Sequence, residues 1–129
     1  MKLVILLLLF ACSITEAQTA KRPAIAYVRR GTEIRLIEPD GSGLFYSTVT
    51  LMRDSANIFR YDFATRKTMQ VTKLENEFAR SFSISPDGKW IVFERAATAD
   101  KDQEADLWIV GTDGRNPHLL VRNGFEPSW

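Results

Sequence analysis

The chain has 129 residues, of which 45% are hydrophobic and 26% charged, a composition that is typical of a globular domain and excludes a disordered chain. Its formal net charge of +1 gives no electrostatic basis for binding nucleic acid or an anionic membrane surface. The single cysteine, Cys12, excludes a disulfide framework, and the single histidine, His118, leaves little material for a metal site.

The N-terminus predicts export. Lys2 precedes an apolar run at residues 3–11, and about nine residues are too few to cross a bilayer, which takes roughly 20. A basic start, a short apolar core and small residues near position 17 predict a secretory signal peptide over residues 1–17, cleaved after Ala17. In a competing interpretation, the sequence LFAC ending at Cys12 is similar to a bacterial lipobox, and Cys12 becomes lipidated. The alternative without export is a buried N-terminal strand or helix.

The rest of the chain predicts short strands. A polar linker occupies residues 18–23, residues 73–79 are a polar connection, and residues 96–105 are a charged loop. Strands are expected at residues 24–28, 33–38, 44–52 (one long or two short), 57–63, 68–72, 82–84, 90–93, 106–110 and 117–121. No helical period appears after the signal segment, so the fold class is all-β.

The stretch 81–95 gives the strongest structural signal. The turn Pro86-Asp87-Gly88 separates two apolar runs, because proline presets φ, aspartate accepts turn N–H groups and glycine takes a positive φ. The second run, residues 90–93, is apolar on both faces, whereas a strand with one wet face would alternate with polar residues. The sequence therefore predicts a strand that is covered on both sides by stacked sheets.

Two segments repeat along the chain. Residues 57–72 and 106–121 share the order polar, apolar, aromatic, turn and strand, and they start about 49 residues apart. A period in the forties with four short strands per unit is typical of a β-propeller. A third copy at residues 33–48 lies one hairpin too close to the second. This favours the interpretation that a strand pair is missing there; in the alternative, Pro39-Asp40-Gly41 closes the first hairpin of a blade, as Pro86-Asp87-Gly88 does.

Three motifs together resemble the WD40-like PD40 repeats of the bacterial TolB-type propellers. They are SPDGKWIVF at residues 85–93, DLWIV at 106–110 followed by Thr112-Asp113-Gly114, and IEPDGSG at 37–43. The resemblance covers nearly all of residues 24–129. It implies a partial β-propeller of about two and a half four-stranded antiparallel blades over residues 24–129, and EPSW at 126–129 is similar to the opening strand of a further blade.

The resemblance also sets an expectation about completeness. The α/β domain that precedes the propeller in TolB has no counterpart here, and family propellers have six or more blades. We therefore expect a truncated gene product or fragment, marginally stable or prone to aggregate, because terminal blades without a cap expose apolar faces. The side chains expected to lie partly on such faces are Trp90, Phe93, Trp108 and Trp129.

Candidate catalytic and metal sites give only weak signals. The acidic loop at 100–106 lacks the glycine of a calcium loop and contains Lys101, so a solvated loop is expected. His118 has no partner for a metal site, and Asp40, Asp87 and Asp113 are explained by turn geometry. Arg29-Arg30 and Arg66-Lys67 are isolated basic pairs, so a nucleic-acid-binding patch is not expected. The sequence contains neither the G-x-S-x-G motif of a serine nucleophile nor a glycine-rich phosphate-binding loop. No catalytic residue, cofactor or metal is therefore predicted.

Three functions remain open from the sequence. The resemblance implies a non-catalytic scaffold, periplasmic or secreted and on the lipobox interpretation anchored to the outer membrane, that holds other envelope or secreted proteins on its rim or in its channel. The alternative is the N-terminal propeller of a prolyl-oligopeptidase-type serine peptidase whose catalytic domain is absent here. A carbohydrate-active propeller is a third and weaker option, since no base or metal site supports it.

Overall fold

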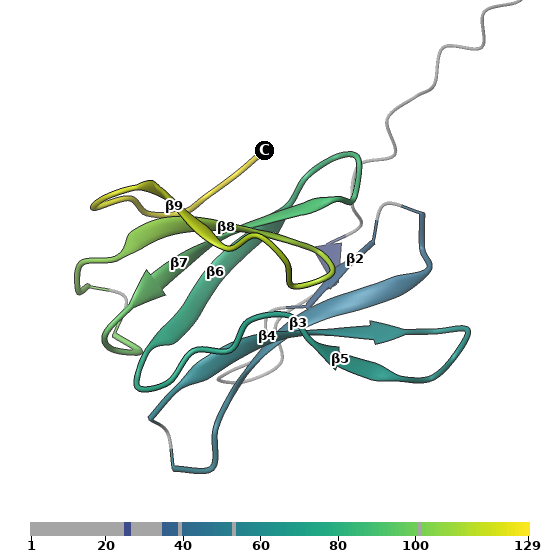
Figure 1. Cartoon of the computed structure of the whole chain (residues 1–129), viewed down its shortest axis with the longest axis horizontal. Helices are drawn as coiled ribbons and strands as arrows, with labels where there is room; N and C mark the ends of the chain where they lie inside the picture. Colours follow the sequence, from purple (N-terminus) through teal and green to yellow (C-terminus); the bar gives the residue numbers. More distant parts are fainter. Residues whose placement is uncertain (1–24, 27–34, 39, 53, 101) are drawn as a thin grey trace, which may run out of the picture.

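The computed structural model describes residues 25, 26, 35–38, 40–52, 54–100 and 102–129, and the interpretations that fall on Cys12, on the signal segment, on Arg29-Arg30 and on Pro39 lie outside these residues. The described residues form nine strands and no helix (Figure 1), which confirms the all-β class. The strands are β1 (Ile25–Ala26), β2 (Arg35–Ile37), β3 (Gly43–Val49), β4 (Ala56–Asp62), β5 (Thr68–Gln70), β6 (Phe78–Ile84), β7 (Trp90–Ala96), β8 (Asp106–Gly111) and β9 (His118–Val121). In this described part of the chain, no helix is long and apolar enough to cross a membrane.

The strands form two antiparallel meanders. Within the set β1–β5, neighbouring strands along the chain pair with each other, and the same holds within the set β6–β9. Only one parallel pair, Ala56 with Phe78, links β4 to β6. We call β2–β5 the first blade and β6–β9 the second blade; Figure 1 shows the second blade, green to yellow, stacked on the blue and teal strands of the first. The arrangement is a partial β-propeller.

The same turn closes the first hairpin of both blades. In the second blade, the Ser85 N–H donates to the Trp90 carbonyl (2.9 Å) and the Lys89 N–H donates to Asp87 Oδ1 (3.0 Å). In the first blade, the Glu38 N–H donates to the Gly43 carbonyl (3.0 Å) and the Ser42 N–H donates to Asp40 Oδ1 (2.8 Å). The glycines of the two turns, Gly41 and Gly88, have φ values of 74° and 70°, which glycine adopts without strain.

This equivalence corrects the interpretation of a missing strand pair. The turns that start at Glu38 and Ser85 lie 47 residues apart, and each is followed by three strands that complete a four-stranded blade. The PDG-type turn near Asp40 therefore closes the first hairpin of a blade, and no strand pair is missing. The sequence comparison went wrong because residues 33–48 were aligned with the second hairpin of a blade, which carries a similar Asp-Gly turn at Asp113-Gly114.

The core lies between the two blades. Its fully enclosed members come from the facing sides of both: Phe45 and Ile58 from the first blade, and Ile84, Ile91 and Phe93 from the second. Val92, on the opposite side of β7, is only 5% exposed, so the strand that is apolar on both faces is covered on both sides. A sheet covers only the side that faces the first blade; the irregular C-terminal residues lie on the other side, where a stacked sheet was predicted. Phe93 is 2% exposed, which shows that its expected position on a bare face was wrong. The expectation fits Trp90, which is half-buried, and Trp129, which is 52% exposed. It was wrong for Trp108, which is half-buried on the face between the two blades.

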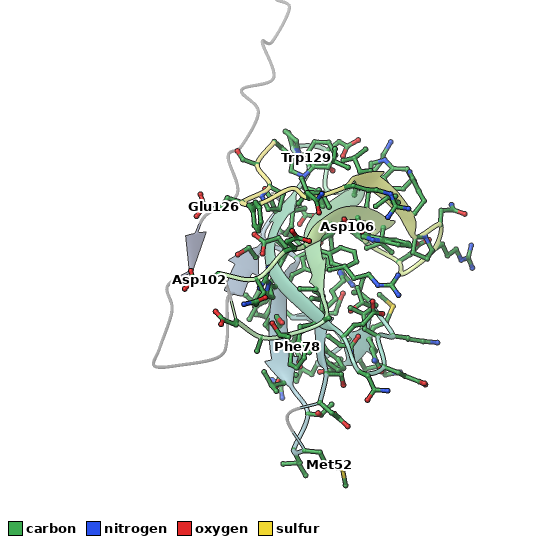
Figure 2. All side chains as sticks on the ribbon, turned by 90° about the vertical axis from the view of Figure 1, so that its left-hand side faces the viewer. Met52, Phe78, Asp102, Asp106, Glu126 and Trp129 are labelled. Carbon is green, nitrogen blue, oxygen red and sulfur yellow. The ribbon has the colours of Figure 1, made fainter. Side chains whose placement is uncertain are left out.

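Several strand ends differ from the predicted ones. β3 ends at Val49, and Leu51 and Met52 form the exposed tip of the β3–β4 connection, at the far end of the molecule from Trp129 (Figure 2). β6 begins at Phe78, inside the predicted polar connection, because Phe78 and Ala79 are buried against the first blade. Polar composition suggested a connection there, but packing between the blades makes it a strand.

The last residues cover part of the second blade. The Gly124 N–H donates to the Ala105 carbonyl (3.0 Å), the Glu126 N–H donates to Glu94 Oε1 (2.8 Å) and the Trp129 indole donates to the Ser83 carbonyl (3.2 Å). These residues form no strand, but they lie over β6 and β7 on the side that faces away from the first blade. The opening strand of a further blade that was expected at residues 126–129 is therefore not formed, and the segment is docked but irregular.

Candidate functional site

A cavity of about 460 Å³ lies in the groove between the two blades. One wall is the connection that follows β5, with Val71 and Leu74; the other is the second blade, with Phe93 and Trp108. We call this site the inter-blade groove; it is lined by Gln70, Val71, Thr72, Lys73, Leu74, Phe93, Arg95, Trp108, Val110, Asp113, Gly114, Arg115 and Pro117. Its apolar floor continues the core, and Leu74 and Trp108 pack against that core while remaining partly exposed.

Trp108 is held in place by a stacked cation. The Arg95 guanidinium lies 4.3 Å from the centre of the Trp108 ring. Its Nε donates to both carboxylate oxygens of Glu77 (3.0 Å each) and its Nη2 donates to Glu77 Oε2 (2.5 Å). The guanidinium is therefore held by the Glu77 carboxylate as well as by the Trp108 ring. Such a cation over an indole face contributes about 0.5–1 kcal/mol when exposed to solvent. The groove therefore presents a preorganised aromatic side chain, which reduces the entropy lost on binding a ligand.

The β8–β9 turn closes one end of the groove. The Thr112 hydroxyl donates to the Gly88 carbonyl (3.0 Å), which ties this turn to the β6–β7 turn. Gly114, at φ 81°, packs so closely that a Cβ there would lie 2.9 Å from the Val71 carbonyl oxygen. Glycine is needed at this position both for its backbone conformation and for the close approach of the two blades.

The polar rim of the groove carries more positive than negative charge. Lys73, Arg95 and Arg115 line it together with one carboxylate, Asp113. Arg95 is neutralised by Glu77, and the Arg115–Asp113 pair is loose, at 3.8 Å with both side chains largely exposed. Exposed pairs of this kind contribute little energy, so Lys73 and Arg115 can rearrange toward an anionic ligand.

Most residues considered for chemistry lie outside this groove. Asp40 and Asp87 are turn residues: the Ser42 N–H lowers the pKa of Asp40, and the Ser85 hydroxyl with the Lys89 N–H lowers the pKa of Asp87. His118 is exposed on β9, with Nδ1 2.9 Å from the Asn116 carbonyl oxygen. Of the three turn aspartates only Asp113 reaches the groove, so the structure does not bring the three carboxylates together. Within the described part of the chain, no group of three or more His, Cys, Asp or Glu residues could hold a metal ion.

The acidic loop has a structural role that sequence reasoning missed. The Arg80 guanidinium, 5% exposed, donates to the Asp100 and Gln103 carbonyls of this loop, the latter at 3.1 Å. Arg80 Nε lies 3.1 Å from Glu94 Oε2 without pointing its N–H at that oxygen, so the two form a buried ion pair rather than a hydrogen bond through Nε. The sequence analysis did not single out Arg80, because the sequence alone does not show the loop that covers this side chain.

Known proteins support the fold and nothing finer. No family model matches the chain. A solved structure, that of a protein assigned as TolB from Agrobacterium tumefaciens, superposes with a TM-score of 0.56 at 19% sequence identity. The likeness covers 71% of this chain and 31% of the TolB chain, so this chain spans about a third of that structure. At this identity the similarity establishes a TolB-like propeller fold.

Proposed function

We propose that the chain is a non-catalytic, exported propeller module of the PD40-repeat type that binds a partner protein of the cell envelope or the secreted fraction. The observation that carries the proposal is the inter-blade groove, which combines a preorganised, half-exposed Trp108 with an adaptable cationic rim. Aromatic side chains and arginine are enriched at protein interfaces, which supports a protein ligand over a small metabolite.

The geometry of the groove favours an extended segment. One wall is the connection after β5 and includes Leu74, and the outer edge of β5 itself is unpaired in the described structure. Trp108 and Pro117 lie on the opposite wall. An extended peptide would place apolar side chains on this floor and carboxylates near Lys73 and Arg115. The predicted ligand is thus a mixed apolar and acidic segment of a partner protein, bound without covalent chemistry.

A peptide titration tests this proposal. Synthetic extended peptides that alternate leucine or phenylalanine with aspartate are titrated into ¹⁵N-labelled protein, with lysine in place of aspartate in the matched control peptides. We expect chemical-shift changes confined to residues 70–74, 93–95 and 108–117, and at least tenfold weaker binding for Trp108→Ala and for Arg115→Glu. Equal binding of acidic and basic peptides, or shift changes centred elsewhere, would contradict the proposal.

Export and lipidation are tested separately. We expect the protein recovered from the cell envelope to begin at Gln18, or to carry a lipid on Cys12, and intact-mass spectrometry distinguishes the two forms. Recovery of the protein from the cytoplasm with Met1 and the apolar segment intact would contradict export.

A further inference from the structure

Asn123 and Gly124, which follow β9, form the single Asn-Gly pair in the sequence. An asparagine before glycine loses its side-chain amide readily, because glycine has no side chain to shield the next peptide nitrogen from the amide carbon. The other asparagines, Asn57, Asn76 and Asn116, precede isoleucine, glutamate and proline. Isoleucine and glutamate shield that nitrogen, and proline has no N–H to lose. The sequence thus makes Asn123 the position where spontaneous deamidation should be fastest.

Packing against β8 requires the glycine of this pair. A Cβ at Gly124 would lie 2.7 Å from Leu107 Cγ and 2.9 Å from Leu107 Cδ1, so a larger residue would displace that side chain. Asn123 itself is exposed and has a φ of 51°, in the left-handed region that asparagine adopts more readily than most residues. The close approach to Leu107 therefore places glycine after an exposed asparagine, and that glycine makes the asparagine reactive.

The docked state restrains the reaction. Ring closure joins the Gly124 nitrogen to Asn123 Cγ, and the nitrogen must first lose its proton. In the structure the Gly124 N–H donates to the Ala105 carbonyl (3.0 Å), and the Asn123 N–H donates to Asp106 Oδ1 (3.0 Å). The Gly124 amide must therefore come away from Ala105 before its nitrogen can attack. Local opening of an exposed segment needs less free energy than global unfolding, so this step is accessible in the folded protein.

We propose that Asn123 is a spontaneous modification site that reacts when residues 124–129 detach from the second blade, and that the reaction hinders their return. The Gly124 nitrogen bonds to Asn123 Cγ, the bond from Cγ to Nδ2 breaks, and ammonia leaves a succinimide ring. Water then opens the ring at either carbonyl and yields aspartate or isoaspartate, so water is the only co-reactant. This inference goes beyond the proposed partner binding and does not rest on it, because Asn123 does not line the inter-blade groove.

Isoaspartate would disturb the register of the docked segment. In isoaspartate the main chain runs through Cβ and Cγ, which adds an atom between residue 123 and Gly124. Three hydrogen bonds depend on the present spacing: they run from the Gly124 N–H to the Ala105 carbonyl, from the Glu126 N–H to Glu94 Oε1 (2.8 Å) and from the Trp129 indole to the Ser83 carbonyl (3.2 Å). A lengthened main chain cannot keep all of them at their present distances.

Both products also add a carboxylate where carboxylates already gather. Asn123 lines a polar pocket together with Glu104 and Asp106. The arginines of this pocket already face other carboxylates: Arg95 faces Glu77 and Arg122 faces Asp106. A negative charge at residue 123 is therefore repelled by its neighbours, so docking weakens even where the product is aspartate and the main chain is unchanged.

Timed incubation of the full chain tests the reaction. Protein is held in mildly alkaline buffer, folded in one sample and unfolded in guanidinium chloride in the other, and peptide mapping by mass spectrometry follows each asparagine. We expect conversion at Asn123, with isoaspartate among the products, and a rate at least about tenfold slower in the folded chain. Asn76 is the internal control, because it is also exposed, with a φ of 56°, but precedes Glu77. It should remain intact while Asn123 converts.

Two variants separate the gate from its consequence. Trp129→Ala removes the indole hydrogen bond of the segment and should raise the rate at Asn123 several-fold. Asn123→Gly keeps the left-handed backbone and the N–H but has no amide to lose. After incubation, hydrogen exchange at the Gly124 and Glu126 amides should be about tenfold faster in the converted chain and unchanged in Asn123→Gly. Circular dichroism should show the same strand content for both variants and the unmodified chain.

Several results would overturn the proposal. Equal rates at Asn123 in the folded and unfolded chains, or a rate that Trp129→Ala leaves unmoved, would show that docking is not the gate. Conversion of Asn76 as fast as Asn123 would remove the selectivity. Unchanged exchange at Gly124 and Glu126 in the converted chain would show that the segment docks as before.

Discussion

At the scale of single residues, the most consequential group is the buried pair Arg80–Glu94, in which both side chains are 5% exposed. Glu94 also accepts a hydrogen bond from the Glu126 N–H, and Arg80 donates to carbonyls of the acidic loop. The pair therefore fastens the loop and the C-terminal segment to the second blade. A buried pair of this kind is weak evidence for net stabilisation, but removing one partner leaves an uncompensated charge.

We predict that Glu94→Ala lowers the free energy of unfolding by about 3–5 kcal/mol, because Arg80 then stays buried without its counter-charge. The double variant Arg80→Met/Glu94→Leu should be clearly more stable than Glu94→Ala, since it removes both charges. Urea unfolding at pH 7 measures both changes. If Glu94→Ala cost less than about 1 kcal/mol, the pair would not be buried as described.

The turn aspartates make stability sensitive to acid. The pKa of Asp87 lies below its ordinary value of 3.8, mainly because the Ser85 hydroxyl donates to the ionised carboxylate. As pH falls through about 4 the unfolded chain takes up a proton before the folded one, so this contribution is present above that pH and is lost as pH falls through the lowered pKa. We predict that Asp87→Asn, which still accepts hydrogen bonds but does not titrate, shows a smaller loss of stability between about pH 5 and pH 2. Urea unfolding across this range measures it; slopes identical to those of the unmodified protein would contradict the assignment.

At the scale of elements, the sequence predicted the parts of the fold that depend on local chemistry. The turn at Asp87-Gly88 and the strand after it, which is apolar on both faces, were assigned correctly. Turn geometry and burial on both faces each require particular residue types within about ten consecutive positions, so a short stretch of sequence is enough to indicate them. The start of β6 at Phe78 was missed, since its burial depends on the first blade rather than on its neighbours in sequence. The repeat was found, but the register of the copy at residues 33–48 was not, because the second blade contains two Asp-Gly turns, Asp87-Gly88 and Asp113-Gly114, and the wrong one was used for the alignment.

The inter-blade groove could not be predicted in the same way. It brings Leu74 close to Trp108, 34 residues later, and that contact follows only once the blades are packed. The one usable signal was the aromatic residue at the centre of a predicted strand, Trp108. A core position explained it equally well, and the residue is in fact partly core and partly groove.

An element-scale substitution tests which side of β4 faces the core. Ile58 on β4 is 0% exposed and belongs to the core cluster, whereas Leu51, in the connection before β4, is 104% exposed. We predict that Ile58→Ala costs about 2–5 kcal/mol of unfolding free energy through lost burial and a cavity. Leu51→Ala should change it by less than about 0.5 kcal/mol. Chemical denaturation of the two variants gives the comparison, and similar costs for both would mean that β4 is turned the other way.

At the scale of the whole molecule, the two blades share one core and should unfold together. All three tryptophans lie in or beyond the second blade, so tryptophan fluorescence reports on that part of the molecule. Ile58→Ala, a change in the first blade, should shift the fluorescence transition to the same extent as the circular dichroism transition of the whole chain. A tryptophan transition unmoved by Ile58→Ala would show that the blades unfold independently.

The stacked fold depends most directly on the contact between the blades, where the Ser47 hydroxyl donates to the Ala79 carbonyl and Ala56 pairs with Phe78. The measurement that tests it is the set of nuclear Overhauser contacts in isotopically labelled protein. We predict cross-peaks that link Ser47 to Ala79 and Ala56 to Phe78, together with contacts between the Ile58 methyl groups and core side chains of β6 and β7. Cross-peaks confined within each meander, with none between the strands β3–β4 and β6–β7, would contradict the stacked blades and the inter-blade groove.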